Sequence, residues 1–153
     1  MASVNDVARY ILDRLAPSQF GDRITAWKLQ KLVYYAQARS LVWDEAPLFE
    51  EEIQAWANGP VCPELYKQHR GRFRLYAGDI QGDPAQLTQD QTETIDAVIR
   101  YYGDKSAHWL SDLTHMERPW QQAREGVEEG EPSNAVITHE AMAAYYESIQ
   151  PGD

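Results

Sequence analysis

The sequence predicts a mainly α-helical fold: a compact single-domain bundle of about six helices, with one short extended or β-like element before a Gly-Pro turn. Apolar residues recur at the spacing of a helix face along most of the chain. Ser or Thr precedes several of these stretches and Gly or Pro ends others, as expected at helix termini. The length of 153 residues matches the about 100–200 residues of one domain. We therefore expect residues 1–153 to form a single domain.

Two helices are predicted at the start of the chain. Ser3 is a suitable N-cap with Asp6 three residues later, and the apolar residues that follow predict a helix from Val4 to Ala16. Thr25 caps a second, longer helix from about Ala26 to Trp43, which is apolar on almost all sides. A helix of that kind is buried, so we expect this second helix at the centre of the fold.

The helical spacing lapses between residues 44 and 63. Apolar residues alternate loosely there, which predicts a strand-like stretch that ends in the turn Asn58-Gly59-Pro60, because Gly tolerates positive φ and Pro fixes the next φ. A short helix, PELYKQH, follows with Pro63 at its first position. The polar stretch around Gly78 and Gly82 then predicts a surface loop.

Further helices are predicted in the second half of the chain, and each has its own start signal. These signals are a capping box at Asp90 and Glu93, an N-cap at Ser106, a first-turn proline at Pro119, and an N-cap at Thr138. The segment GVEEGEP predicts an exposed acidic loop before the last helix.

Charge and composition exclude several classes of protein. Fourteen Lys and Arg against 24 Asp and Glu give a net charge of −10, which repels phosphate backbones and disfavours nucleic-acid binding. No apolar run reaches the about 18–20 residues needed to span a bilayer, so we expect no membrane partner. A single cysteine, Cys62, and the lack of a leader-like segment after Met1 predict a cytoplasmic location.

The residues offer little for catalysis or for binding a metal or cofactor. The histidines have no HExxH spacing, there is no CxxC pair, and no Gly-rich phosphate motif occurs, so we expect neither metal nor cofactor. The closest histidine–carboxylate pair is His115 with Glu117. A small enzyme that uses this pair stays open as an alternative and requires both side chains in one substrate-sized pocket. We expect instead that they tie their helix to the Pro119 turn and that the chain is not an enzyme.

Aromatic residues exceed what core filling requires, with five Trp and nine Tyr. Both residue types are enriched at the centres of protein interfaces. Core packing is expected at periodic or turn-anchored positions, which are Trp27, Trp56, Trp109 and Trp120. Exposure is expected where the side chain fits a core stripe less well, which is the case for Trp43, Tyr34 and Tyr76.

One stretch of this acidic chain is basic. It contains Lys67, Arg70, Arg72 and Arg74, interleaved with Phe73 and Tyr76. It could be a solvated helix end, a protein contact or an RNA contact, and the net charge places RNA last. Interfaces draw most of their energy from a few Trp, Tyr and Arg residues. We therefore expect a partner-binding surface formed by Tyr34, Trp43, Lys67, Arg70, Arg72, Arg74 and Tyr76.

Three groups of residues occur in an order that identifies a family. They are Lys28-Leu29-Gln30-Lys31-Leu32 with Tyr34-Tyr35-Ala36-Gln37, then Ala55-Trp56 and Gly59-Pro60-Val61 before Pro63-Glu64-Leu65-Tyr66, and finally His115 with Pro119-Trp120. Together they resemble the Panacea domain of SocA-like and phage-associated GepA-like antitoxins, over about residues 4–146. The resemblance implies an antitoxin that neutralises a cognate toxin, encoded by an adjacent gene, through direct protein contact. It also leaves open an adaptor that delivers the toxin to a cytoplasmic protease.

The residues of this signature are expected to be structural. Lys28 and Lys31 can extend over apolar surface or pair with acids, and Gln30 can satisfy backbone groups of the Asn58-Gly59-Pro60 turn. The full set expected to stabilise the fold is Lys28, Gln30, Lys31, Tyr35, Trp56, Gly59, Pro60, His115, Pro119 and Trp120.

Overall fold

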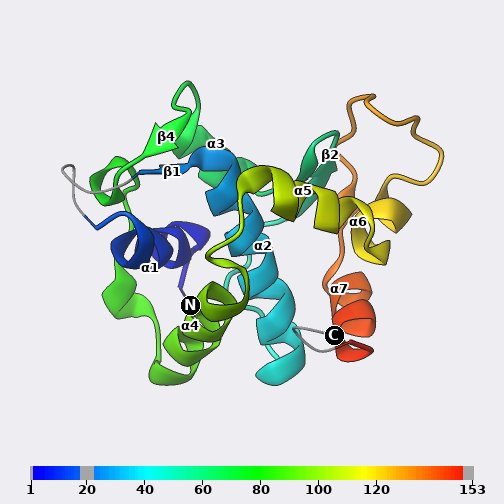
Figure 1. Cartoon of the computed structure of the whole chain (residues 1–153). Coiled ribbons are helices and arrows are strands. Elements are labelled where there is room, and N and C mark those ends of the chain that lie inside the picture. Colours follow the sequence, from blue (N-terminus) through cyan, green and yellow to red (C-terminus); the bar gives the residue numbers. More distant parts are fainter. Residues whose placement is uncertain (1, 18–22, 150–153) are drawn as a thin grey trace.

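The computed structural model describes residues 2–17 and 23–149, and in this part the fold is mainly helical, as predicted (Figure 1). The α-helices are α1 (Val4–Leu15), α2 (Ala26–Trp43), α3 (Pro63–His69), α4 (Gln89–Tyr102), α5 (Ala107–His115), α6 (Arg118–Ala123) and α7 (His139–Glu147). The strands are β1 (Ile24–Thr25), β2 (Ile53–Trp56), β3 (Gly59–Val61), β4 (Arg74–Leu75) and β5 (Val136–Ile137). Two short 3-10 helices, η1 (Ala77–Asp79) and η2 (Pro84–Gln86), precede α4. Among the described residues, no helix has the length and apolar character that crossing a membrane requires.

Helix α2 lies at the centre of the fold, as predicted, with α1, α4, α5 and α7 packed around it (Figure 1). Its residues are buried on every side, including Leu29, Val33 and Tyr35. This arrangement follows from its composition, because a helix without a continuous polar face has no side that prefers water.

Most helix starts lie where the sequence places them. The side chains of Ser3, Thr25, Ser106 and Thr138 each accept a backbone N–H at the start of a helix. The capping box predicted at Asp90 and Glu93 is wrong by two residues. Thr88 Oγ1 accepts from the N–H of Gln91 at 3.2 Å, and Gln91 Oε1 accepts from the N–H of Thr88 at 2.9 Å. This earlier pair satisfies the first N–H groups of α4. Asp90 then lies in the first turn, where its negative charge interacts favourably with the positive end of the helix dipole.

The predicted strand-like stretch is a β-hairpin whose turn differs from the predicted one. Strands β2 and β3 pair antiparallel, with Trp56 opposite Gly59, so the turn residues are Ala57 and Asn58. Gly59 has the expected positive φ, +126°, but it begins the second strand. Pro60 is tolerated in that strand because β3 is an edge of the sheet, whose order is β3-β2-β5.

The surface loop predicted after α3 is partly wrong. β4 pairs antiparallel with β1, with Leu75 opposite Ile24, and both of these side chains are buried. Ala77 donates its N–H to the carbonyl of Ala16 at 3.0 Å, and Ile80 is buried in the core. The loop therefore closes one end of α1 even though most of its residues are polar.

Four predictions about aromatic residues are wrong. Trp27 and Trp56, expected in the core, are partly exposed. Trp109, expected in the core, is 45% exposed on the outer side of α5. Tyr34, expected at a partner-binding surface, is 1% exposed, because α2 is enclosed and its hydroxyl lies 3.0 Å from that of Tyr146 on α7. Trp43 is partly exposed near the end of α2, with the Arg39 guanidinium 5.8 Å from its ring centre.

Candidate functional site

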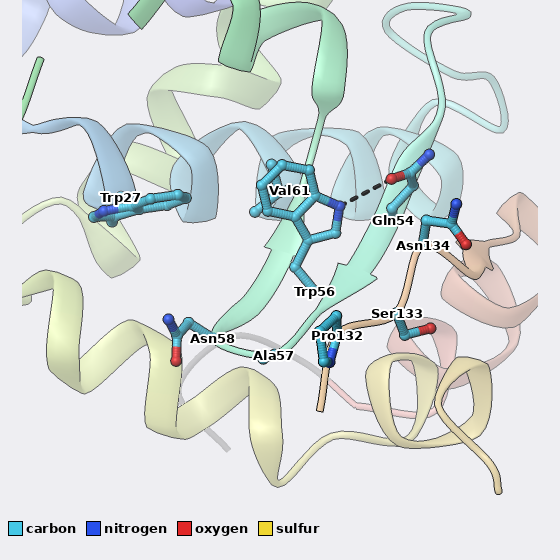
Figure 2. Close-up of a pocket in the computed structure, with 9 residues that line it drawn as sticks. All are labelled: Trp27, Gln54, Trp56, Ala57, Asn58, Val61, Pro132, Ser133 and Asn134. Carbon is cyan, nitrogen blue, oxygen red and sulfur yellow. Dashed lines mark hydrogen bonds between the residues drawn. The ribbon is translucent and has the colours of Figure 1, made fainter. Parts of the chain in front are cut away.

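A groove of about 490 Å³ opens beside the β2–β3 hairpin (Figure 2). Three segments form it: the first turn of α2, the hairpin, and the segment that precedes β5. Its lining residues are Trp27, Gln54, Trp56, Ala57, Asn58, Val61, Pro132, Ser133 and Asn134. We call it the tryptophan groove, because the indole rings of Trp27 and Trp56 lie on two of its walls.

The alternation of β2 turns Trp56 toward the groove. Ile53 and Ala55 are buried against the core, whereas Gln54 and Trp56 lie on the opposite, partly exposed face. The indole Nε1 of Trp56 donates to Oε1 of Gln54 at 2.9 Å, which restricts the rotation of the ring (Figure 2). The first strand of the hairpin thus supplies both the aromatic surface and the group that orients it.

Tyr66 of α3 packs against both tryptophans. Its ring centre lies 6.2 Å from that of Trp27 in a stacked arrangement and 5.2 Å from that of Trp56 in an edge contact. His69, one turn further along α3, meets the edge of Trp27 at 5.8 Å. Because Tyr66 supports both tryptophan rings, which lie on separate elements, the width of the groove between these rings is fixed by the fold.

The third wall is brought to the groove by β5. Val136 pairs with Gln54, and the carbonyl of Ala135 accepts the N–H of Ala55 at 2.8 Å, so residues 132–134 lie beside β2. The buried guanidinium of Arg124 donates to the carbonyl of Ala55 at 2.9 Å and to the carbonyls of Glu128 and Glu131, in the loop between α6 and β5. The sequence prediction missed this wall, because a two-residue strand leaves no periodic signal.

The groove is suited to binding and not to proton transfer. All nine lining residues are uncharged, and Trp27, Trp56 and Pro132 provide apolar surface, whereas Asn58 and Asn134 are exposed polar residues of the lining. General acid–base catalysis needs a titratable side chain within hydrogen-bond reach of the substrate. An apolar site with a polar rim is the arrangement that protein interfaces use.

Lys31 and Gly59, two residues of the signature, fit against each other beside the groove. A Cβ atom at residue 59 would lie 2.5 Å from Cε of Lys31, so the lysine stem occupies the space that a side chain would need. The positive φ of Gly59 adds a second reason for glycine at this position. The Lys31 side chain is buried, and this burial lowers its pKa to about 8.

The other two polar residues at the start of α2 bind backbone groups. Gln30 accepts from the N–H of Cys62 at 2.9 Å and donates to its carbonyl at 3.3 Å. This is the role predicted for Gln30, but the partner lies just after β3 and not in the hairpin turn. Lys28 donates from Nζ to the carbonyl of Gly103 at 2.6 Å, at the end of α4.

His115 and Glu117 are held in different surroundings. The ring nitrogens of His115 lie 2.6 Å from the carbonyl of Ser111 and 3.1 Å from that of Ala57, so this residue joins α5 to the hairpin turn. Glu117 is buried and accepts hydrogen bonds through Oε1 from Tyr35 at 2.6 Å and from Tyr146 at 2.7 Å. Glu117 is also absent from the lining of the shallow cavity beside His115. The predicted tie to the Pro119 turn is made by His115, whose ring packs edge-on against Trp120 with centres 4.1 Å apart and whose carbonyl accepts from Nε2 of Gln121 at 2.8 Å. Glu117 contacts Tyr35 and Tyr146 instead.

None of the cations of the basic stretch lines the groove. Arg70, Arg72 and Arg74 are exposed, and Phe73 between them is 63% exposed. Part of this charge is already paired, because Arg72 lies 3.1 Å from Asp79 and Lys67 lies 2.8 Å from Glu64. Tyr76 is partly buried, with the Arg23 guanidinium 5.1 Å from its ring centre.

Comparison with known proteins identifies the family of the chain. Residues 29–121 match the family described as "Antitoxin SocA-like, Panacea domain"; this range includes Lys31 and the hairpin but neither Trp27 nor the third wall. Antitoxin SocA of Caulobacter vibrioides (strain NA1000 / CB15N) is 30% identical over 132 residues, and the match covers 78% of this chain and 69% of that protein. No solved structure matches the chain. The chain belongs to the Antitoxin SocA-like, Panacea domain family.

Proposed function

We propose that the chain is an antitoxin that neutralises a cognate protein toxin by direct contact, and that the tryptophan groove receives part of the toxin. The observation that carries the proposal is the pair of partly exposed tryptophans, Trp27 and Trp56, held across an uncharged groove in a member of an antitoxin family. Interfaces concentrate their energy in Trp, Tyr and Arg residues at well-packed pockets. Both indoles are held in place by Tyr66, so little ordering is needed when a partner binds.

The first test is neutralisation in a purified mixture. The candidate toxin is the product of the gene adjacent to the one that encodes this chain. We expect the purified chain to inhibit this toxin without ATP or any protease, because binding alone blocks it. A toxin that stays fully active in the mixture, but is degraded in cells only when the chain is present, would support the adaptor instead.

The second test locates the contact. Asn134 is an exposed residue of the third wall, so Asn134→Trp should fill the groove without disturbing the core. We expect this variant to bind the toxin at least about tenfold more weakly, a loss of about 1.4 kcal/mol, measured by isothermal titration calorimetry. Glu93→Trp, at an exposed position of α4 outside the groove lining, is the matched control and should bind normally.

The basic stretch provides the comparison variant for this second test. In the proposal it lies at the edge of the interface and steers an acidic patch of the toxin toward the chain, so charge reversal at Arg70 and Arg72 should slow association. We expect slower association and any loss of contacts to weaken binding about tenfold together. The circular dichroism spectrum should stay unchanged. If Asn134→Trp binds normally and only the charge reversal weakens binding, the interface lies on the basic stretch and not in the groove.

A further inference from the structure

Lys31 has a buried charge that the fold does not pair. Its side chain is 1% exposed, and Nζ lies 5.7 Å from the ring centre of Trp27. Within residues 2–17 and 23–149, no carboxylate lies within salt-bridge distance of Nζ, and burial is the cause of its lowered pKa. A buried charge without a partner is costly to a fold, and a methionine of similar length would avoid that cost.

The lysine lines a small cavity next to the tryptophan groove. This side cavity has a volume of about 240 Å³ and is lined by Trp27, Lys31, Asn58, Ala107, His108 and Ser111. It shares Trp27 and Asn58 with the groove, so one ligand could occupy both at once. The absence of a side chain at Gly59 leaves the room through which the lysine stem reaches this position.

We propose that the side cavity receives a side-chain carboxylate of the toxin, which pairs with Nζ of Lys31 while a neighbouring apolar side chain of the toxin occupies the tryptophan groove. This inference rests on the proposed function and specifies the chemistry of its partner: an acidic residue next to an apolar one in an exposed segment of the toxin. A charge-assisted hydrogen bond in a desolvated site is about twice as strong as a neutral one. The charge of Lys31 therefore contributes little to stability in the free chain and much to binding.

The overall charge of the chain gives this site selectivity. At −10, the surface as a whole repels acidic segments, so a carboxylate is favoured only where an uncompensated cation faces it at short range. At physiological salt the general repulsion is screened beyond about 8 Å, whereas a contact inside the cavity is not. An acidic segment is thus accepted in one register, with its carboxylate at Lys31.

The test uses two blocked dipeptides that differ only in charge, N-acetyl-Leu-Glu-amide and N-acetyl-Leu-Gln-amide. Binding is followed by the NMR shifts of the Trp27 and Trp56 indole N–H groups of the full chain. We expect the Glu peptide to bind at least about tenfold more tightly than the Gln peptide at pH 7. Lys31→Met should abolish this preference, and Lys67→Met, which removes an exposed lysine paired with Glu64, should retain it.

Raising the pH provides a second readout. With the pKa of free Lys31 at about 8, only about a tenth of the lysine is protonated at pH 9, so the preference for the Glu peptide should fall about tenfold from its fully protonated value. The other ionisable groups near the cavity are His69 on α3, His108 and Asp112 on α5, and Lys28 on α2. Lys31→Met retains all four, so any pH effect that persists in this variant belongs to them.

The outcomes separate this inference from the function on which it rests. Equal binding of the two peptides, or no shift with either, would overturn the carboxylate site. A wild-type chain that neutralises the toxin no better than Lys31→Met would do the same and leave the antitoxin role standing. If the wild-type chain fails to neutralise the toxin but prefers the Glu peptide, the proposed function is wrong and the site is real. Lys31→Gln, which keeps a polar end without charge, replaces Lys31→Met if the latter does not fold.

Discussion

Replacing Trp120 with alanine is expected to lower the free energy of unfolding by about 3–5 kcal/mol, the usual cost of removing a buried large aromatic side chain. Trp120 is 8% exposed, and its indole Nε1 donates to the carbonyl of Trp56 at 2.9 Å. Its ring meets that of His115 edge-on, with centres 4.1 Å apart. The substitution would therefore open a cavity under the hairpin and leave the Trp56 carbonyl without its donor. Urea denaturation followed by circular dichroism measures the change.

Trp109→Ala is the matched control for this substitution. Trp109 is also a tryptophan, on neighbouring helix α5, but it is 45% exposed and its ring centre lies 5.1 Å from Nζ of Lys105. Its removal should cost less than about 1 kcal/mol. Equal losses for the two variants would contradict the view that Trp120 connects α6 to the hairpin.

Replacing Glu117 with leucine is expected to cost about 2–4 kcal/mol of unfolding free energy. Glu117 accepts hydrogen bonds from the hydroxyls of Tyr35 and Tyr146, and each buried donor left unpaired costs about 1–3 kcal/mol. Tyr146 keeps one alternative partner, the hydroxyl of Tyr34 at 3.0 Å, and this lowers the upper limit of the expected loss of unfolding free energy. Thermal and urea denaturation of both proteins at pH 7 test this expectation, and a leucine variant as stable as the wild type would contradict it.

Glu117→Gln is the conservative variant, and comparing it with the wild type shows how Glu117 makes the stability depend on pH. Burial raises the pKa of Glu117 in the folded protein above its usual value of 4.5. Between the unfolded and the folded pKa the native state binds more protons than the unfolded state, so this residue stabilises the protein most at low pH. Its contribution is lost as the pH rises through the folded pKa. The stability of the wild type relative to Glu117→Gln should therefore fall over that window, and a constant difference would show that Glu117 does not titrate there.

The helices could be predicted from the sequence where a cap and a long apolar pattern agree. Ser3 and Thr25 start α1 and α2 at the predicted residues, because a side-chain cap acts within one turn of the backbone. The hairpin was recognised as extended, but its turn was misplaced, because Gly59 and Pro60 are turn-forming residues that an edge strand also accepts. The pattern also gave no means to distinguish the enclosed Tyr34 from an exposed residue, since α2 has no polar face.

The candidate site was predictable only in part. The signature contained Lys31, Trp56 and Gly59, and these residues do meet at one place. Nothing local in the sequence indicates that residues 132–134 face Trp27, because that contact depends on the pairing of β5 with β2, across more than half of the chain. The basic stretch gave a stronger local signal, yet two of its cations are paired. Lys67 pairs with Glu64 three residues earlier on the same predicted helix, whereas the pairing of Arg72 with Asp79 is revealed only by the fold.

The order of the three walls along the chain determines when the groove exists during protein synthesis. The first turn of α2 and the hairpin are translated first, and residues 132–137, which hold the third wall and the strand that pairs with β2, follow much later. A nascent chain that ends after α3 carries both tryptophans but has nothing opposite them. If the groove receives the toxin as proposed, capture requires a chain translated at least as far as residue 137, so neutralising capacity follows the number of chains that have passed this point and not the number of ribosomes that have started on the message.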